Sequence, residues 1–144
     1  MVNARRAFLE QGYYQPLMNR LLALYHEKMP ADANKPAIVL DAGCGEGFYT
    51  HQHKNAENTV YGVDIAKEAI KKAGKKYKNC HFSVATLSKL PFADSLFSWI
   101  VSVYAPILEN EFTRVLSPGG FLLTVTPAKQ HLMQLKQQIY DDAK

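Results

Sequence analysis

Alternating glycines follow a short apolar run near residue 40. The run at 37–42 reads AIVLDA, and Gly43, Gly45 and Gly47 come directly after it in a G-x-G-x-G pattern. Glycines at this spacing let the chain turn sharply and bring bare backbone close to a ligand. Asp41 precedes them, and a carboxylate there is unfavourable beside a pyrophosphate but favourable beside a cationic sulfonium and amino group. The pattern predicts a seat for a positively charged cofactor.

A second acidic residue, Asp64, comes 17 residues after Gly47, at the end of the apolar segment 58–63. An acidic side chain at this place can accept hydrogen bonds from both hydroxyls of a ribose. Asp64 also precedes a helical pattern, so a helix cap is the alternative role. The glycine loop upstream favours the ribose role.

These residues must be positioned by an alternation of strands and helices. Five strands are predicted at 37–42, 58–63, 81–85, 96–103 and 121–125, with helices at 47–54, 65–76, 107–116 and 131–140. Such alternation favours a mostly parallel, Rossmann-like α/β sheet, for which we expect the order 3-2-1-4-5. The ligand of such a sheet lies at the carboxyl ends of its strands. Residues 1–36 are predicted to be a helical segment packed on the core formed by 37–144.

Composition sets the class of protein. The 144 residues are 47% hydrophobic and 21% charged, as expected of one packed domain. Since no apolar stretch is long enough for a membrane span or a signal peptide, the predicted location is the cytoplasm. Two cysteines exclude a disulfide scaffold or a four-cysteine zinc site. Cys44, His51 and His53 lie close in sequence, so a metal site is conceivable. Histidines that pack in the core or face solvent are the favoured interpretation, and no metal is predicted.

Together these segments resemble the class I S-adenosylmethionine-dependent methyltransferases from about residue 37 to residue 125. The resemblance includes Leu90-Pro91-Phe92 after the third strand and Ser117-Pro118-Gly119-Gly120 before the fifth. It implies S-adenosylmethionine as the cofactor. Many members have an aspartate for the adenine amino group where this chain has Thr86. The adenine contact is therefore expected from the Thr86 hydroxyl or from the backbone near Ala85.

Other segments resemble the RlmA-type 23S ribosomal RNA (guanine-N1)-methyltransferases. They are ARRAFL at 4–9, G-x-Y-x-P-L at 12–17, CGEGFYT at 44–50, YAP at 104–106, TP at 126–127 and HLM-x-LK at 131–136. The resemblance implies ribosomal RNA as partner and guanine N1 as methyl acceptor. This chain departs from the family in two ways: it has no cysteine-rich zinc domain, and it ends one predicted helix after the fifth strand of a seven-stranded sheet. We therefore expect a C-terminally truncated sheet whose open edge favours a homodimer.

The reacting end is expected after the fourth strand, where Tyr104 and Pro106 stand. An aromatic ring there can stack on an extruded base. Alternatively, Tyr104 packs beneath a loop and Pro106 only ends the strand. No decisive general base is present, since Glu46 can equally face solvent or cap a helix. A small-molecule methyltransferase and a catalytically incomplete cofactor-binding module stay open as other functions.

A lysine run follows the second acidic residue. Lys67, Lys71 and Lys75 share one helical face through i, i+4 steps. They could meet phosphates or form a solvated helix face, and the formal net charge of +4 is compatible with a nucleic-acid partner. Trp99, in the middle of the fourth predicted strand, is expected in the core.

Overall fold

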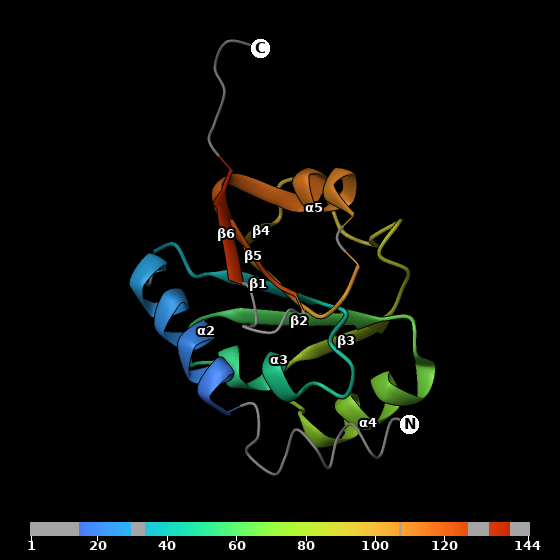
Figure 1. The fold of residues 1–144 in the computed structure, drawn as a ribbon. Coiled ribbons are helices and arrows are strands. Elements are labelled where there is room, and N and C mark those ends of the chain that lie inside the picture. Colours follow the sequence, from blue (N-terminus) through green and yellow to red (C-terminus); the bar gives the residue numbers. More distant parts are fainter. Residues whose placement is uncertain (1–14, 30–33, 107, 127–132, 139–144) are drawn as a thin grey trace.

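The computed structural model describes residues 15–29, 34–106, 108–126 and 133–138. They form one sheet with helices on both of its faces (Figure 1). The strands are β1 (Ile38–Ala42), β2 (Thr59–Asp64), β3 (His81–Val84), β4 (Phe97–Val103), β5 (Leu116–Val125) and β6 (Met133–Gln137). The helices are α2 (Gln15–Lys28), α3 (Phe48–His53), α4 (Lys67–Lys76) and α5 (Glu109–Val115). Within these ranges, no helix combines the length and the apolar character that a membrane crossing requires.

The strand order β3-β2-β1-β4-β5-β6 confirms the predicted Rossmann-like order and adds a sixth strand. The first five strands are parallel, and β1 lies between β2 and β4. The chain therefore adds β2 and β3 on one side of β1, and then crosses over to add β4, β5 and β6 on its other side. A crevice opens where the strand order reverses, at the carboxyl ends of β1 and β4.

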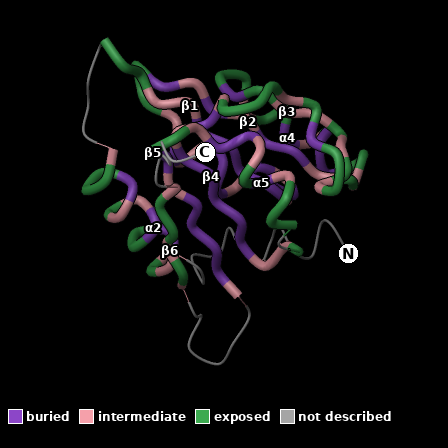
Figure 2. Tube along the Cα trace, turned by 90° about the horizontal axis from the view of Figure 1, so that it is seen from above, coloured by how far each residue is buried: buried purple, intermediate pink, exposed green. Residues whose placement is uncertain are grey.

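The central strands β1 and β4 are buried on both faces, as the continuous apolar run of β4 predicts. Figure 2 shows them as an almost unbroken buried stretch through the middle of the molecule. One apolar cluster, which includes Trp99, lies on the face of α2 and α3, and a second, which includes Phe112, lies on the face of α5. Trp99 is fully buried, which confirms its predicted place in the core. Complete burial of a large apolar side chain stabilises a fold by about 1.5–3 kcal/mol.

Helix α2 belongs to the first of these clusters. Tyr25, near its end, packs edge-on against the rings of Trp99 and His53, with centroid distances of 5.4 and 5.6 Å. Its hydroxyl accepts a 3.0 Å hydrogen bond from Asn58 Nδ2, which also donates to the His53 carbonyl at 2.7 Å. The helix is thus tied to both α3 and the loop before β2. The division at residue 36 stays a prediction, and residues 1–14 and 30–33 of the predicted helical segment lie outside the described residues.

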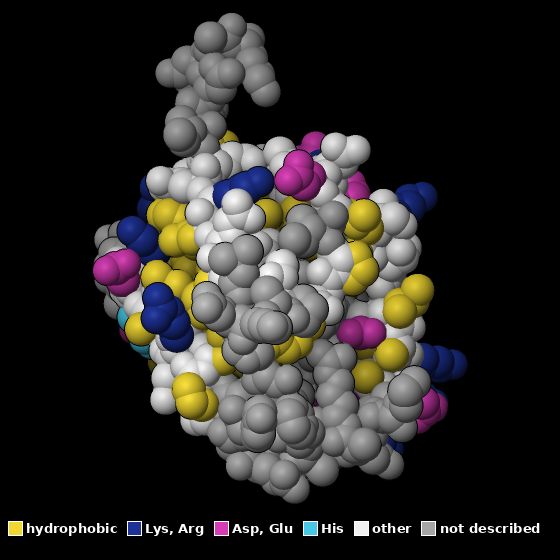
Figure 3. Space-filling view, in the orientation of Figure 1, with side chains coloured by type: hydrophobic (Ala, Val, Ile, Leu, Met, Phe, Trp, Pro, Cys, Tyr) yellow, Lys and Arg dark blue, Asp and Glu magenta, His cyan; other side chains and the backbone are white. Residues whose placement is uncertain are grey.

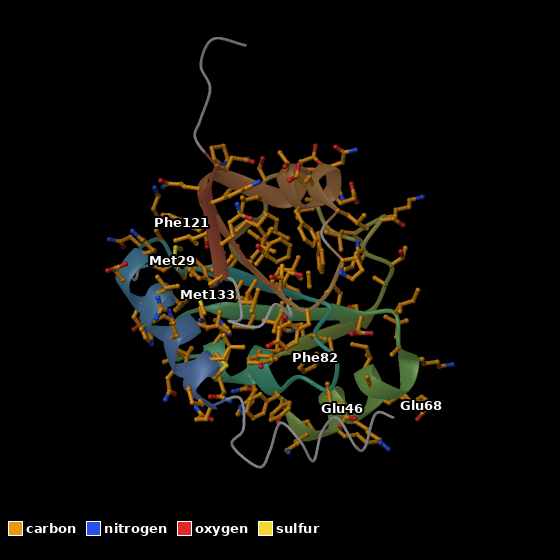
Figure 4. The ribbon with its side chains drawn as sticks, viewed as in Figure 1. Met29, Glu46, Glu68, Phe82, Phe121 and Met133 are labelled. Carbon is orange, nitrogen blue, oxygen red and sulfur yellow. The ribbon has the colours of Figure 1, made fainter. Side chains whose placement is uncertain are left out.

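The helix predicted at 131–140 is wrong, because residues 133–137 form β6, antiparallel to β5. The sequence MQLKQ alternates between half-buried and exposed side chains, which is the period of a strand. Met133 joins Met29 and Phe121 against the core, and Figure 4 shows these three side chains on the same side of the molecule. Apolar residues at 132, 135 and 139 fit helical spacing equally well, so the open backbone of β5 decides the outcome.

Strand β5 also begins earlier than predicted. The segment SPGG at 117–120, expected to end a helix, lies within β5, and Leu116 already pairs with Phe97. A register shift between Phe97 and Trp99 accommodates this segment. The predicted homodimer depended on an unpaired β5 edge. Since β6 pairs with β5, the outer strands of the described sheet are β3 and β6.

Candidate functional site

The loop between β1 and α3 contains the three alternating glycines. Gly43, Gly45 and Gly47 have φ angles of +80°, +57° and +88°, a region that L-residues with a side chain rarely adopt. The amides of Gly43 and Cys44 both donate to the carbonyl of Val63, at 2.8 and 2.9 Å. The loop is therefore fixed against the end of β2, and its sharp turn is the one that the glycine spacing predicts.

Two of these glycines are also needed because other groups approach them closely. A Cβ on Gly43 would lie 2.6 Å from the Cβ of Ala105, in the loop after β4. A Cβ on Gly47 would lie 2.9 Å from both the Phe82 and Tyr77 rings. Phe82, labelled in Figure 4, reaches this loop from β3. The glycine loop is thus packed between two neighbouring segments.

Asp64 binds the glycine loop from the end of β2. Its Oδ2 accepts a 2.9 Å hydrogen bond from the amide of Gly45, and its Oδ1 accepts one of 2.8 Å from the amide of Ala66. The second bond fixes the turn before α4, whose N-cap residue is Ala66 and which has no side-chain cap, so the helix-cap role considered from the sequence is not the one Asp64 takes. Each carboxylate oxygen retains a further lone pair. Asp64 also lines the cavity described below, where a ribose hydroxyl can donate to it.

Asp41 is buried near the end of β1, just before the glycine loop. It is 2% exposed, and its Oδ2 accepts a 2.7 Å hydrogen bond from the Thr50 hydroxyl of α3. It lies beneath the glycine loop and is not among the residues that line the cavity. The carboxylate turns toward Thr50, where the hydroxyl offsets the cost of burying it. Its predicted contact with the cofactor stays a prediction.

Cys44 packs beneath the same loop. A Cβ on Gly62 would lie 2.9 Å from its Sγ, so the thiol occupies the space above that glycine. Burial first, and then the charges of Asp41 and Asp64, raise the pKa of the Cys44 thiol far above its usual range. A raised pKa favours the protonated thiol, which is the less nucleophilic form. Among the described residues, no three histidine, cysteine, aspartate or glutamate side chains are grouped as metal ligands.

A cavity of about 330 Å³ lies at the carboxyl ends of the central strands. Its volume falls at the lower end of the range for small-molecule sites, about 300–1,000 Å³. It is lined by Gly43, Asp64, Ile65, Ala85, Thr86, Leu87, Val103, Tyr104, Ala105, Pro106 and Leu108. The structure therefore brings together six of the nine predicted site residues, and Gly45 and Gly47 adjoin them in the loop.

The charge of the cavity wall is negative. Among the described residues that line it, the only ionisable side chains are Asp64 and Tyr104. A carboxylate in a mostly apolar wall favours a cationic ligand and disfavours a phosphate. The glycine cradle, the acidic group at the end of β2 and the apolar walls therefore fit the charge and shape of S-adenosylmethionine.

Tyr104 stands at the mouth of the cavity with a φ of +57°. The left-handed conformation costs a residue with a side chain about 1–2 kcal/mol. A 2.9 Å hydrogen bond from the Tyr104 amide to the Val125 carbonyl helps to hold it. Strain of this kind concentrates at ligand sites, where the surrounding structure enforces it. Tyr104 is half-buried, so its ring is neither sealed in the core nor free in solvent.

Sequence reasoning missed a clamp on the loop after β3. Arg114 of α5 donates to the carbonyls of Leu90 and Phe92, at 2.9 and 2.8 Å, and its Nε donates to Glu111 at 2.8 Å. Glu111 in turn accepts a 2.7 Å hydrogen bond from the Leu90 amide. Arg114 and the Leu90 amide lower the pKa of Glu111 to about 2. The i, i+3 spacing of Glu111 and Arg114 indicates that these two side chains can pair. It does not indicate that they bind the backbone of Leu90 and Phe92.

That clamp positions the segment that carries Ala85 and Thr86. The Ala85 amide donates to the Asp64 carbonyl at 3.0 Å, so this segment is also tied to β2. The Thr86 hydroxyl is within 2.9 Å of the Ser88 hydroxyl and is exposed at the cavity. It can accept or donate to a ligand there.

Comparison with known proteins agrees with this geometry. A family model described as a methyltransferase domain matches residues 33–144. A 23S rRNA (guanine(748)-N(1))-methyltransferase from Streptomyces fradiae is 34% identical over 94% of this chain and 49% of its own length. A malonyl-[acyl-carrier protein] O-methyltransferase from Hamiltonella defensa is 33% identical over 72% of this chain and 43% of its own length.

A solved SAM-dependent methyltransferase from Methanosarcina mazei superposes with a TM-score of 0.62 and 27% identity, covering 71% of this chain and 56% of that one. The chain spans about half the length of the curated relatives that it matches. The sequence match over most of the chain, the shared fold and the cavity geometry lead to one assignment. This chain belongs to the family of S-adenosylmethionine-dependent methyltransferases.

Proposed function

We propose that this chain forms the cofactor-binding and methyl-transferring part of an enzyme that methylates N1 of a guanine in 23S ribosomal RNA. The observation that carries the proposal is the single cavity wall shared by Gly43, Asp64 and the segment Tyr104–Pro106. The first two belong to a cofactor seat and the third supplies an aromatic ring beside it. The choice of RNA is supported by the resemblance to ribosomal RNA methyltransferases, which extends from one end of the chain to the other.

Each site residue has a defined role in this proposal. Gly43, Gly45 and Gly47 keep the cradle free of side chains, and Asp64 accepts hydrogen bonds from the ribose. Ala85 and Thr86 border the adenine. S-adenosylmethionine supplies a methyl group on a positively charged sulfur. Asp41 supports the cradle from below through Thr50, and its charge acts at a distance.

The nucleotide base is held by Tyr104 and Pro106. A base cannot be methylated inside a stack, so it must be extruded and held against an aromatic or apolar surface. The bond from sulfur to the methyl group breaks as the bond from guanine N1 to the methyl group forms, and the N1 proton leaves to solvent. Positioning then supplies most of the rate acceleration. We assign no general base.

A small-molecule methyltransferase is the second candidate, because a malonyl-[acyl-carrier protein] methyltransferase also matches. The third is a cofactor-binding module that does not complete catalysis alone. The RNA assignment also implies a cytoplasmic location, where ribosomes are made. A homodimer that forms through a sheet edge would use β3 or β6, the outer strands among the described residues, and sedimentation at high concentration tests for it.

The test measures cofactor binding and methyl transfer separately. We expect Asp64→Asn to weaken S-adenosylhomocysteine binding by roughly 10-fold in calorimetry, because one charge-assisted hydrogen bond is lost. Tyr104→Ala should keep cofactor affinity and lose methyl transfer to an unmodified 23S rRNA transcript, whereas Tyr104→Phe should retain it. Transfer to malonyl-acyl carrier protein but not to RNA would refute the RNA proposal. Unchanged turnover in Tyr104→Ala would refute the role of the ring.

A further inference from the structure

The positive charge of this chain is concentrated in one segment. Residues 67–78 contain six lysines and one acidic residue, a net charge of +5, whereas the whole chain carries +4. The other residues together therefore carry −1. A basic character that resides in one helix is a local surface feature and not a general property of the composition.

Helix α4 presents these lysines to solvent. Its inner face buries Ala69, Ile70 and Ala73, so Lys67, Lys71 and Lys75 stand on the opposite side, where all three are exposed. The helix rises about 1.5 Å per residue, so these three positions extend over about 12 Å. Figure 3 shows basic and acidic side chains projecting from the molecule where α4 lies in Figure 1. We refer to Lys67, Lys71 and Lys75 as the lysine ridge.

Helix stability explains only part of the lysine ridge. Lys75 lies in the last turn, where a positive charge complements the helix dipole, but Lys67 lies in the first turn, where a positive charge opposes it. The three lysines also repel one another at i, i+4 spacing. Glu68 offers partial compensation, with an oxygen 3.8 Å from Lys71 Nζ, but both side chains are more than half exposed. An exposed pair of this kind contributes little. The ridge therefore requires another explanation.

The position of the ridge supplies one. Asp64 and Ile65 line the cavity, and Lys67 follows two residues later. Ile65 itself is 74% exposed, an unusual state for a large apolar residue. The ridge thus begins at the rim of the proposed site and leads away from it along α4. A polyanion whose reacting unit entered the cavity would have its neighbouring backbone close to this face.

We propose that the lysine ridge binds the phosphate backbone of the RNA beside the target nucleotide. The proposal rests on the RNA substrate proposed above and names the surface that holds that RNA outside the cavity. Lysines contact phosphates as compact charges and read no sequence, so the ridge contributes affinity and orientation. Each phosphate contact releases counterions, which makes the affinity depend on salt.

The experiment compares two triple variants that change the charge equally. The first is Lys67→Gln with Lys71→Gln and Lys75→Gln. The control is Lys28→Gln with Lys35→Gln and Lys136→Gln, three exposed lysines outside α4. Binding to an unmodified 23S rRNA transcript is measured by filter retention over a range of salt, and S-adenosylhomocysteine binding by calorimetry. Thermal unfolding checks that each variant is folded.

We expect the ridge variant to bind the transcript roughly 10–100-fold more weakly and to lower the slope of log affinity against log salt by about 2. The control should stay within about 3-fold of the parent chain, and a variant with arginine at the three ridge positions should retain binding. Equal losses in both triple variants would overturn the ridge while leaving the RNA substrate intact. A parent chain that binds cofactor but not the transcript would overturn the proposed function itself.

Discussion

Replacing Gly43 with alanine tests how tightly the glycine loop packs against the loop after β4. Gly43 has a φ of +80°, and a Cβ there would lie 2.6 Å from the Cβ of Ala105. The left-handed backbone costs an alanine about 1–2 kcal/mol, and overpacking costs about 1–3 kcal/mol. We therefore expect Gly43→Ala to lower the free energy of unfolding by about 2–5 kcal/mol. A displaced cradle should also weaken cofactor binding.

Two other glycines separate these costs. Gly119 has the same φ of +80°, but a Cβ there would meet nothing within 4 Å. Gly119→Ala should therefore show the backbone cost alone, about 1–2 kcal/mol. Gly74 lies within α4 without a positive φ and also has open space around it. Gly74→Ala should raise the free energy of unfolding by about 0.5–1 kcal/mol, because alanine favours a helix interior.

The assay is urea unfolding of these three variants together with S-adenosylhomocysteine calorimetry. A double variant, Gly43→Ala with Ala105→Gly, removes the opposing methyl and should recover part of the loss through a coupling of about 0.5–3 kcal/mol. The backbone cost of Gly43→Ala should persist in it. The reasoning fails if Gly43→Ala costs no more than Gly119→Ala, or if Ala105→Gly recovers nothing.

Other predictions concern a buried histidine and the arginine clamp. His53 Nδ1 donates to the Tyr49 carbonyl at 2.7 Å, its Nε2 has no partner among the described residues, and burial lowers its pKa from 6.5 to about 4. Below pH 6.5 the His53 imidazole binds a proton in the unfolded chain but not in the folded chain. The free energy of unfolding, measured in urea, should therefore fall by roughly 3 kcal/mol as the pH falls to 4. His53→Gln should remove most of this pH dependence. Arg114→Lys removes the fork that holds the Leu90 carbonyl, so S-adenosylhomocysteine affinity should fall by roughly 10-fold. The control is Arg20→Lys, at an exposed residue of α2, which should have no effect. Calorimetry with equal losses in both arginine variants would contradict the clamp.

The parts of the site that the sequence predicted are those with a local signal. The glycine spacing requires positive φ angles within one short loop, and all three appear. The apolar run of β4 indicates burial on both faces, and this prediction does not depend on which strands lie beside it. Once strands and helices alternate, the handedness of the crossovers leaves few strand orders, so the place of the cavity at the strand ends follows.

The parts that it could not predict depend on partners distant in the chain. Asp41 precedes the glycines as expected, but its direction is decided by the Thr50 hydroxyl, which is available only after α3 has packed. Strand β6 exists because β5 offers it a ladder, and the residues of β6 fit a helix nearly as well. Arg114 shows the same limit, because the carbonyls of Leu90 and Phe92 that it holds lie more than twenty residues away. Each miss is a choice between local options that tertiary contacts settle.

The three glycines of the loop therefore have structural roles in this fold besides making room for a ligand. Gly43 makes room for Ala105, Gly47 makes room for rings from β3 and from the residue after α4, and the Gly45 amide donates to Asp64. All three serve the assembly of neighbouring segments before any ligand arrives. A cofactor-binding Rossmann-like sheet needs this packing whatever reaction it supports. The loop thus identifies a cradle, and the methyl-transfer assignment depends on what surrounds it. Among the described residues that line the cavity, Asp64 has no basic neighbour, and the strained Tyr104 lies in the same wall.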